Sequence, residues 1–182
     1  MIRAFIAVEF EPTEEIKALH RELRETGCEL RLVSLHQIHI TLRFLGNIEE
    51  SAVEEISGIL RNCAPAREFL VKLRGIGAFP NLNHINVVWI GISNPAELER
   101  MSTCINEKLV EAGFPKEDRP FTPHLTVARV KGRRNLNVLQ RLIKENAMRN
   151  FGDVQVNAVH LKKSVLTPEG PIYTNLFSQV FG

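Results

Sequence analysis

The same order of predicted elements occurs twice in this chain, and each copy carries a histidine and a threonine separated by one apolar residue. The first copy reads "HITLRFLG", His39 to Gly46, and the second reads "HLTVARV", His124 to Val130. Both runs are short and mostly apolar, as in β-strands. A strand and a helix are predicted before each run, and a helix and a strand after it. The repeated order predicts an internal duplication, with pseudo-repeats over about 1–81 and 82–182.

A duplicated unit of this length predicts two lobes packed about an approximate twofold axis, rather than a solenoid of short stacked repeats. Equivalent residues of the two copies are then expected to face each other across a cleft. The alternative is that two generic strand, helix, strand units resemble each other because such units are common. The matching placement of the two H-x-T triplets favours duplication.

Helical periodicity is clear in two segments and predicts which of their residues face the core. The first segment follows the N-terminal strand and ends near Gly27, and the second follows Pro95. The residues expected on their inner faces are Ile16, Leu19 and Leu23 in the first and Leu98, Met101, Ile105 and Leu109 in the second.

Composition indicates an ordinary globular domain with no membrane partner. The chain has 182 residues, of which 44% are hydrophobic, and a net charge of +2. No run reaches the ~18 apolar residues that a membrane span needs. The apolar N-terminus includes Glu9 and Glu11 and resembles a first strand rather than a signal peptide. The three cysteines are odd in number and form no C-x-x-C pattern, so we expect free thiols and a cytoplasmic protein.

Strand geometry determines which residues can act together. Residues i and i+2 of a strand project from the same face, so His39 lies beside Thr41 and His124 beside Thr126. The same alternation directs Phe44 into the core. A single histidine in such a strand is more often structural than catalytic. Two copies at matching places favour catalysis.

Acid–base chemistry on a phosphodiester fits this arrangement. One imidazole accepts a proton from the nucleophile while the other donates one to the leaving oxygen, and an unperturbed pKa near ~6.5 suits both tasks. The threonine hydroxyls can donate hydrogen bonds to non-bridging phosphate oxygens. Four such groups around one phosphate need no metal, so no cofactor is expected.

Other chemistries find less support in the sequence. A zinc site usually has three or four protein ligands, and no Asp or Glu stands at a telling spacing from either histidine. There is no G-x-S-x-G elbow, P-loop or dinucleotide fingerprint. The remaining histidines and Tyr173 have no paired context, and we expect surface or structural roles for them.

The runs "HITLRFLG" and "PHLTVARV" resemble the paired H-x-T signatures of the two-histidine phosphoesterase superfamily, and closely those of its RNA 2′,3′-cyclic phosphodiesterases, also called 2′-5′ RNA ligases. The resemblance covers nearly the whole chain. It implies a bilobal α+β fold, with two antiparallel sheets lining a central cleft and helices outside. It also implies hydrolysis of an RNA terminal 2′,3′-cyclic phosphate to a 2′-phosphate, with reversible 2′-5′ joining of RNA ends as a second activity.

Carried onto this chain, the resemblance assigns His39 and His124 as the acid–base pair and Thr41 and Thr126 as phosphate-binding residues. We assign His124 as the base that activates water and His39 as the acid that protonates the departing 3′ oxygen. The duplicated motifs look alike, so the sequence leaves this order open.

Two arginines are further candidates for binding the phosphate. The family uses an arginine five residues after the second histidine, where Arg129 stands. Strict alternation puts Arg129 on the face opposite His124, so the strand must bulge, twist or end there. Arg43, four residues after His39, is predicted on the histidine face.

Three hypotheses of function follow. The first is a metal-independent phosphodiesterase that acts, as a monomer, on RNA with 2′,3′-cyclic phosphate ends. The second is a non-catalytic RNA-binding module, against which the scarcity of Tyr and Trp weighs. The third is a cyclic phosphodiesterase for small nucleotides, which the H-x-T motif cannot separate from the first.

Overall fold

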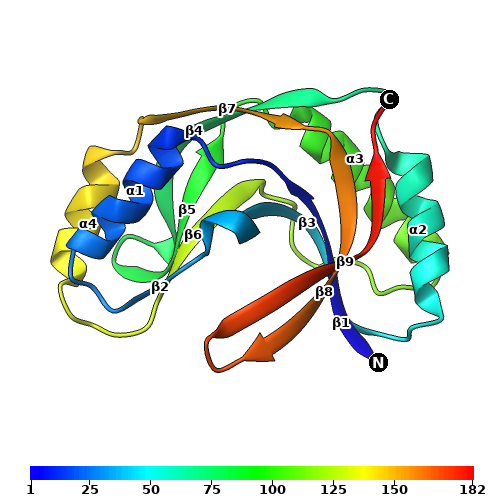
Figure 1. The fold of residues 1–182 in the computed structure, drawn as a ribbon, viewed down its shortest axis with the longest axis horizontal. Helices are drawn as coiled ribbons and strands as arrows, with labels where there is room; N and C mark the ends of the chain where they lie inside the picture. The colour runs from blue at the N-terminus through cyan, green and yellow to red at the C-terminus, as the bar shows by residue number, and fades with distance from the viewer.

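The computed structural model describes residues 1–182, which form four α-helices and nine β-strands (Figure 1). In chain order the elements are β1 (Ile2–Glu9), α1 (Glu14–Glu25), β2 (Leu30–Leu32), β3 (His39–Ile48), α2 (Ala52–Cys63), β4 (Phe69–Asn81), β5 (His84–Ile92), α3 (Ala96–Glu111), β6 (His124–Val130), α4 (Leu136–Glu145), β7 (Asn150–Val156), β8 (Ala158–Thr167) and β9 (Gly170–Val180). A single 3₁₀ turn, Leu35–Gln37, precedes β3. None of the helices is long and apolar enough to cross a bilayer.

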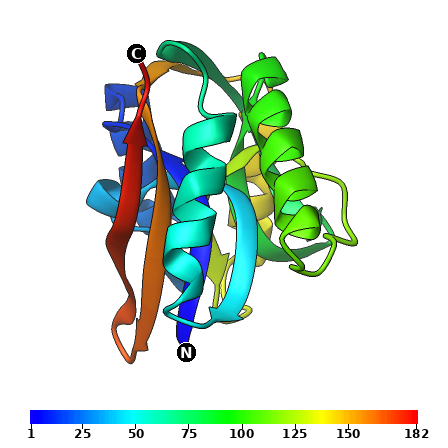
Figure 2. The same ribbon diagram turned by 90° about the vertical axis from the view of Figure 1, so that its right-hand side faces the viewer.

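The strands form two antiparallel sheets. Sheet A has the order β3-β1-β8-β9 and sheet B the order β2-β6-β5-β4-β7. Figure 1 shows α1 and α4 at one side of the molecule and α2 and α3 at the other, outside the sheets. Figure 2 shows α2 and α3 side by side, and these two helices are in contact. The predicted α+β class, with two antiparallel sheets and outer helices, is confirmed.

Each sheet contains strands from both halves of the sequence. β8 and β9 complete sheet A beside β1 and β3, while β2 and β4 lie in sheet B with β5, β6 and β7. The boundary near residue 81 falls in the turn between the paired strands β4 and β5. Pairing across the halves covers strand edges that would otherwise be exposed. Each sheet is therefore completed by strands from both predicted repeats.

One core of 36 buried apolar residues underlies both sheets. The two helical faces predicted from periodicity are buried: α1 contributes Ile16, Leu19 and Leu23, and α3 contributes Leu98, Met101, Ile105 and Leu109. α1 begins after Thr13, whose Oγ1 accepts a hydrogen bond of 3.2 Å from the amide of Ile16. These contacts determine where both sheets lie, and hence where the residues of the H-x-T strands lie.

The expectation of three free thiols was wrong. Cys63, at the end of α2, is disulfide-bonded to Cys104 in α3, with their Cα atoms 5.7 Å apart, and only Cys28 is free. The two bonded cysteines are 41 residues apart in sequence, so no local spacing pattern indicated the pair. The packing of α2 against α3 brings them together.

Candidate active site

The two histidines of the H-x-T strands have the same local geometry. His39 Nδ1 lies 2.8 Å from the carbonyl oxygen of Gln37, and His124 Nδ1 lies 2.6 Å from that of Thr122. A carbonyl oxygen only accepts hydrogen bonds, so in each ring Nδ1 carries the proton. The neutral imidazole therefore keeps its lone pair on Nε2. Both rings are oriented by the backbone two residues earlier and have Nε2 free for chemistry.

A β-bulge in β6 places Arg129 on the same face as His124. Along β5, Thr126 pairs with Trp89, but the next pair is Ala128 with Val88, which leaves Val127 as an extra residue. The extra residue reverses the alternation beyond it. Arg129 is thus paired with Val87 on the face that carries His124 and Thr126. The prediction that Arg129 needs an irregular strand to reach this face is confirmed.

A second bulge, in β3, has the opposite consequence for Arg43. Thr41 pairs with Ala7 and Arg43 with Ile6, which leaves Leu42 as the extra residue. Ile6 belongs to the core, so Arg43 points away from the face of His39 and is only 6% exposed. Its guanidinium donates to Glu117 at 3.0 Å and to the carbonyl of Pro115. The prediction that Arg43 lies on the histidine face was wrong, because alternation alone does not anticipate a bulge.

The same bulge exposes Phe44 on the histidine face. Phe44 pairs with Phe5, two positions from the pair of Thr41, and its side chain is 63% exposed. The prediction from strand alternation that Phe44 points into the core was therefore also wrong. Phe44 follows His39 by five residues, as Arg129 follows His124. Both strands therefore place the fifth residue after the histidine beside the H-x-T face.

An aromatic ring lies edge to face with each imidazole. The rings of His39 and Tyr173 have centroids 5.3 Å apart at an angle of 88°, and those of His124 and Phe79 are 5.0 Å apart at 89°. Phe5, which is buried, lies 5.1 Å from the His39 ring. These contacts restrict rotation of the imidazoles and reduce their access to water. Tyr173 therefore has a role in shaping the site that its sequence context did not indicate.

Burial lowers the pKa of His39 below its ordinary value, and the positive charge of Lys162 lowers it further. The hydrogen bond to Gln37 and the charge of Glu9 oppose this shift. The strands that carry the two histidines, β3 of sheet A and β6 of sheet B, are in contact, and the charge of His124 also lowers the pKa of His39. The free protein therefore favours neutral His39.

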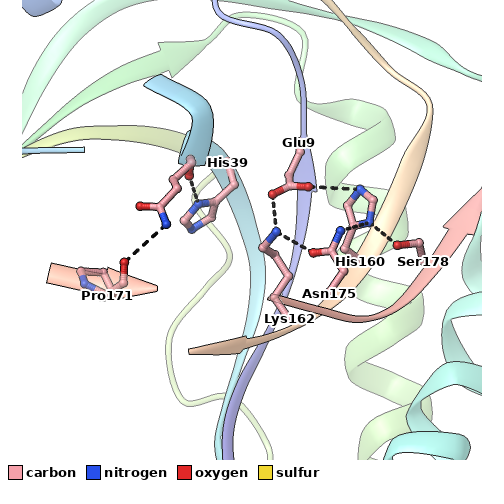
Figure 3. A network of polar contacts seen from close by, with 8 residues as sticks. Glu9, His39, His160, Lys162, Pro171, Asn175 and Ser178 are labelled. Atoms are coloured by element: carbon pink, nitrogen blue, oxygen red, sulfur yellow. Dashed lines mark hydrogen bonds and ion pairs between the residues drawn. The ribbon is translucent and has the colours of Figure 1, made fainter. Parts of the chain in front are cut away.

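A polar network that the sequence did not reveal lies next to His39 on sheet A (Figure 3). Glu9 is the ladder partner of His39 and accepts a hydrogen bond from the Nζ of Lys162, which is only 4% exposed. Lys162 also donates to Asn175 Oδ1 at 2.7 Å. His160 lies 3.6 Å from Glu9, and burial lowers its pKa. The network thus offsets the desolvation cost of burying the Lys162 ammonium beside the candidate active site.

A pocket of about 720 Å³ opens beside this network, between the ends of the two sheets. Glu9 and His160 line it from sheet A and Asp153 from sheet B, while neither His39 nor His124 borders it. The pocket thus adjoins the paired imidazoles without containing them. The geometry of the histidines, rather than the size of a cavity, locates the candidate chemistry.

Comparisons with known proteins agree with this geometry. The sequence pattern of the 2′-5′ RNA ligase superfamily matches residues 12–165. The RNA 2′,3′-cyclic phosphodiesterase of Methanothermobacter thermautotrophicus is 35% identical over 96% of both chains. That of Aeropyrum pernix is 39% identical over 87% of this chain and 90% of its own.

A solved structure shows the same fold over nearly the whole chain. TT0787 of Thermus thermophilus superposes with a TM-score of 0.76 at 28% identity, covering 98% of this chain and 97% of its own. Because the family match spans most of the chain and includes both H-x-T strands, this protein belongs to the 2′-5′ RNA ligase superfamily.

Proposed function

We propose that the protein is a metal-independent RNA 2′,3′-cyclic phosphodiesterase that converts a terminal 2′,3′-cyclic phosphate into a 2′-phosphate. The observation that carries this proposal is the pair of imidazoles from two sheets, each with Nδ1 bonded to a carbonyl and Nε2 free. The relatives named above are RNA 2′,3′-cyclic phosphodiesterases. End joining is a property of the family and an additional proposal for this chain.

The proposed reaction is a single displacement at phosphorus. The base imidazole takes a proton from water as the water oxygen bonds to phosphorus, and the bond from phosphorus to the 3′ oxygen breaks. The second histidine, as imidazolium, gives its proton to that oxygen. Thr41 and Thr126 donate hydrogen bonds to the non-bridging oxygens, and Arg129 balances their charge. No atom or charge is left for a metal to supply.

We assign His124 as the base and His39 as the acid. The lowered pKa of His39 works against this order in the free protein, because it favours the neutral ring. A bound cyclic phosphate carries a negative charge next to both rings and so raises the pKa of His39. Once protonated, an imidazolium of intrinsically low pKa gives up its proton readily to the leaving oxygen.

The direct test is incubation, with chelator present, with a short RNA that ends in a 2′,3′-cyclic phosphate, followed by identification of the new terminus. We expect a 2′-phosphate. His39→Ala and His124→Ala should each lose nearly all turnover, whereas His84→Ala, at the exposed first residue of β5, should keep it. Full activity in either active-site variant, with circular dichroism unchanged, contradicts the proposal.

The other hypotheses are distinguished by the same assay. RNA that binds without change of its terminus would indicate a binding module, and turnover of cyclic mononucleotides alone would indicate a small-molecule enzyme. On the sheet face beside His39, Phe44 is exposed and Tyr173 is half-buried against the imidazole, which is a weak basis for a stacking platform. The phosphodiesterase therefore remains the proposal.

A monomer and a cytoplasmic location are part of the proposal. An RNA substrate is consistent with a cytoplasmic location. With the disulfide between Cys63 and Cys104, a cytoplasmic protein would belong to the intracellular proteins that retain disulfides, such as those of hyperthermophiles. Oligomeric state is tested by sedimentation, for which a monomer of 20.6 kDa is expected.

A further inference from the structure

Two exposed arginines lie directly opposite each other on sheet B. Arg31 on β2 pairs with Arg129 on β6, and directly opposed residues of an antiparallel pair share a face. That face carries His124 and Thr126. Arg31 therefore belongs to the same surface as the candidate active site, one strand beyond Arg129.

This pairing is unfavourable without an anion, because like charges directly opposite each other destabilise a sheet. Neither Arg31 nor Arg129 forms an ion pair with a carboxylate. Glu29, two residues before Arg31, instead packs against Gly132, where an added Cβ would lie 1.3 Å from its Oε2. The two guanidinium groups thus present positive charge that no carboxylate of the protein pairs with.

A third arginine adds to the positive charge at this end of the site. Arg3, exposed on β1, and Arg129 both lower the pKa of Tyr173, against the larger raising effect of burial. A positive charge from each sheet therefore acts on the pKa of Tyr173, the ring that contacts His39. Glu9 lies at the other end of β1, beside the pocket that Asp153 also lines. The unpaired positive charges thus lie at one end of the site, while Glu9, at the other end, is paired with Lys162.

The spacing separates Arg31 from the reacting phosphate. Arg129 is paired two residues further along β5 than Thr126, or roughly 7 Å, which a long side chain can cover. Arg31 lies a further strand away, about 4.8 Å, on the side of β6 opposite β5. Arg129 is thus the nearer of the two arginines to the phosphate held by the threonines, and Arg31 lies beyond it on the same face.

We propose that Arg31, beside Arg129, binds the phosphate on the 5′ side of the terminal nucleotide. This inference rests on the proposed function and specifies its substrate class: RNA ends, or nucleoside cyclic phosphates that carry a 5′-phosphate, in preference to cyclic mononucleotides with a free 5′-hydroxyl. The 5′ strand of the RNA then leaves the site over Arg31 and Arg3, away from the carboxylates of Glu9 and Asp153.

The test compares adenosine 2′,3′-cyclic phosphate with its 5′-phosphorylated form, which differs only in the phosphate assigned to Arg31. The wild-type protein should show a KM about tenfold lower for the 5′-phosphorylated compound, as expected for one charge-assisted contact. Arg31→Gln should abolish this difference while leaving the KM of the unphosphorylated compound within about twofold. Arg31→Lys should restore part of it, because the charge remains.

The matched control is Arg67→Gln, which removes another exposed arginine, in the loop between α2 and β4, and should keep the preference. With a short cyclic-phosphate RNA, Arg31→Gln should also reduce the dependence of log KM on log salt by about one phosphate contact. If the wild-type protein hydrolyses both compounds without preference, or if Arg31→Gln weakens both equally, the inference fails alone. If it hydrolyses neither compound and also leaves the cyclic-phosphate RNA unchanged, the proposed function fails with it.

Discussion

Arg129 lies on the same face of β6 as His124 because one extra residue, Val127, interrupts the pairing between them. In a regular strand, two residues five apart point to opposite faces. The bulge thus brings a fixed positive charge to the side of the sheet where an imidazole and a hydroxyl already converge.

Replacing Arg129 tests whether this charge acts in the reaction. Arg129→Ala should reduce kcat/KM for a cyclic-phosphate RNA about 10²-fold, since a charge-assisted contact to the reacting phosphate is lost. Arg129→Lys should recover part of the rate. The side chain is exposed, so the thermal midpoint should change little. Arg133→Ala is a suitable control, and equal losses in both variants would argue against a specific role.

The order of acid and base is tested with a substrate whose bridging 3′ oxygen is replaced by sulfur. A thiolate leaves without being protonated, so the variant that lacks the acid should regain much of its rate, while the variant that lacks the base should not. We expect rescue of His39→Ala and none of His124→Ala, measured as the ratio of rates on the sulfur and oxygen substrates. Rescue of His124→Ala alone would reverse the assignment.

Stability should fall as the solution is acidified. Burial lowers the pKa of His20, His39 and His160 in the folded protein below the ordinary value of about 6.5. The unfolded chain therefore binds more protons than the folded protein. The stability that these three histidines contribute is fully present above a pH of about 6.5 and is lost as the pH falls towards their pKa values in the folded protein. Urea unfolding between pH 7.5 and about 5 measures this loss.

The same unfolding measurement can separate the contribution of His39 to the pH dependence of stability. His39→Gln removes one of the three groups, so its free energy of unfolding should depend less on pH than that of the wild-type protein. His36→Gln, which removes an exposed imidazole close by in the chain, provides the comparison. A wild-type protein whose stability rises on acidification would contradict the lowered pKa values.

The disulfide should contribute to stability rather than to chemistry. Replacing Cys63 and Cys104 together by serine should reduce the free energy of unfolding by about 2–4 kcal/mol, because the bond closes a loop of 41 residues in the unfolded chain. Turnover at a temperature well below the thermal midpoint should persist. Cys28→Ser, which removes the free thiol, is the control and should have a much smaller effect.

The sequence determined the elements of this fold and the core of its candidate site. Helical and strand periodicity depend on local backbone geometry, so the inner faces of α1 and α3 could be predicted correctly. His39 with Thr41, and His124 with Thr126, are two residues apart on strands, and no bulge intervenes within either pair. Local spacing was sufficient to place each histidine beside its threonine.

Tertiary structure decided everything that depends on residues distant in sequence. The extra residue in β3 turned Arg43 into the protein and Phe44 out of it, the extra residue in β6 brought Arg129 to the histidine face, and register is set by pairing with other strands. The disulfide formed because α2 packs on α3. The effect of a charge, such as that of the opposed Arg31 and Arg129 or of the buried Lys162, also depends on its neighbours in space. Electrostatic interactions depend on distance and burial, which the linear sequence does not contain.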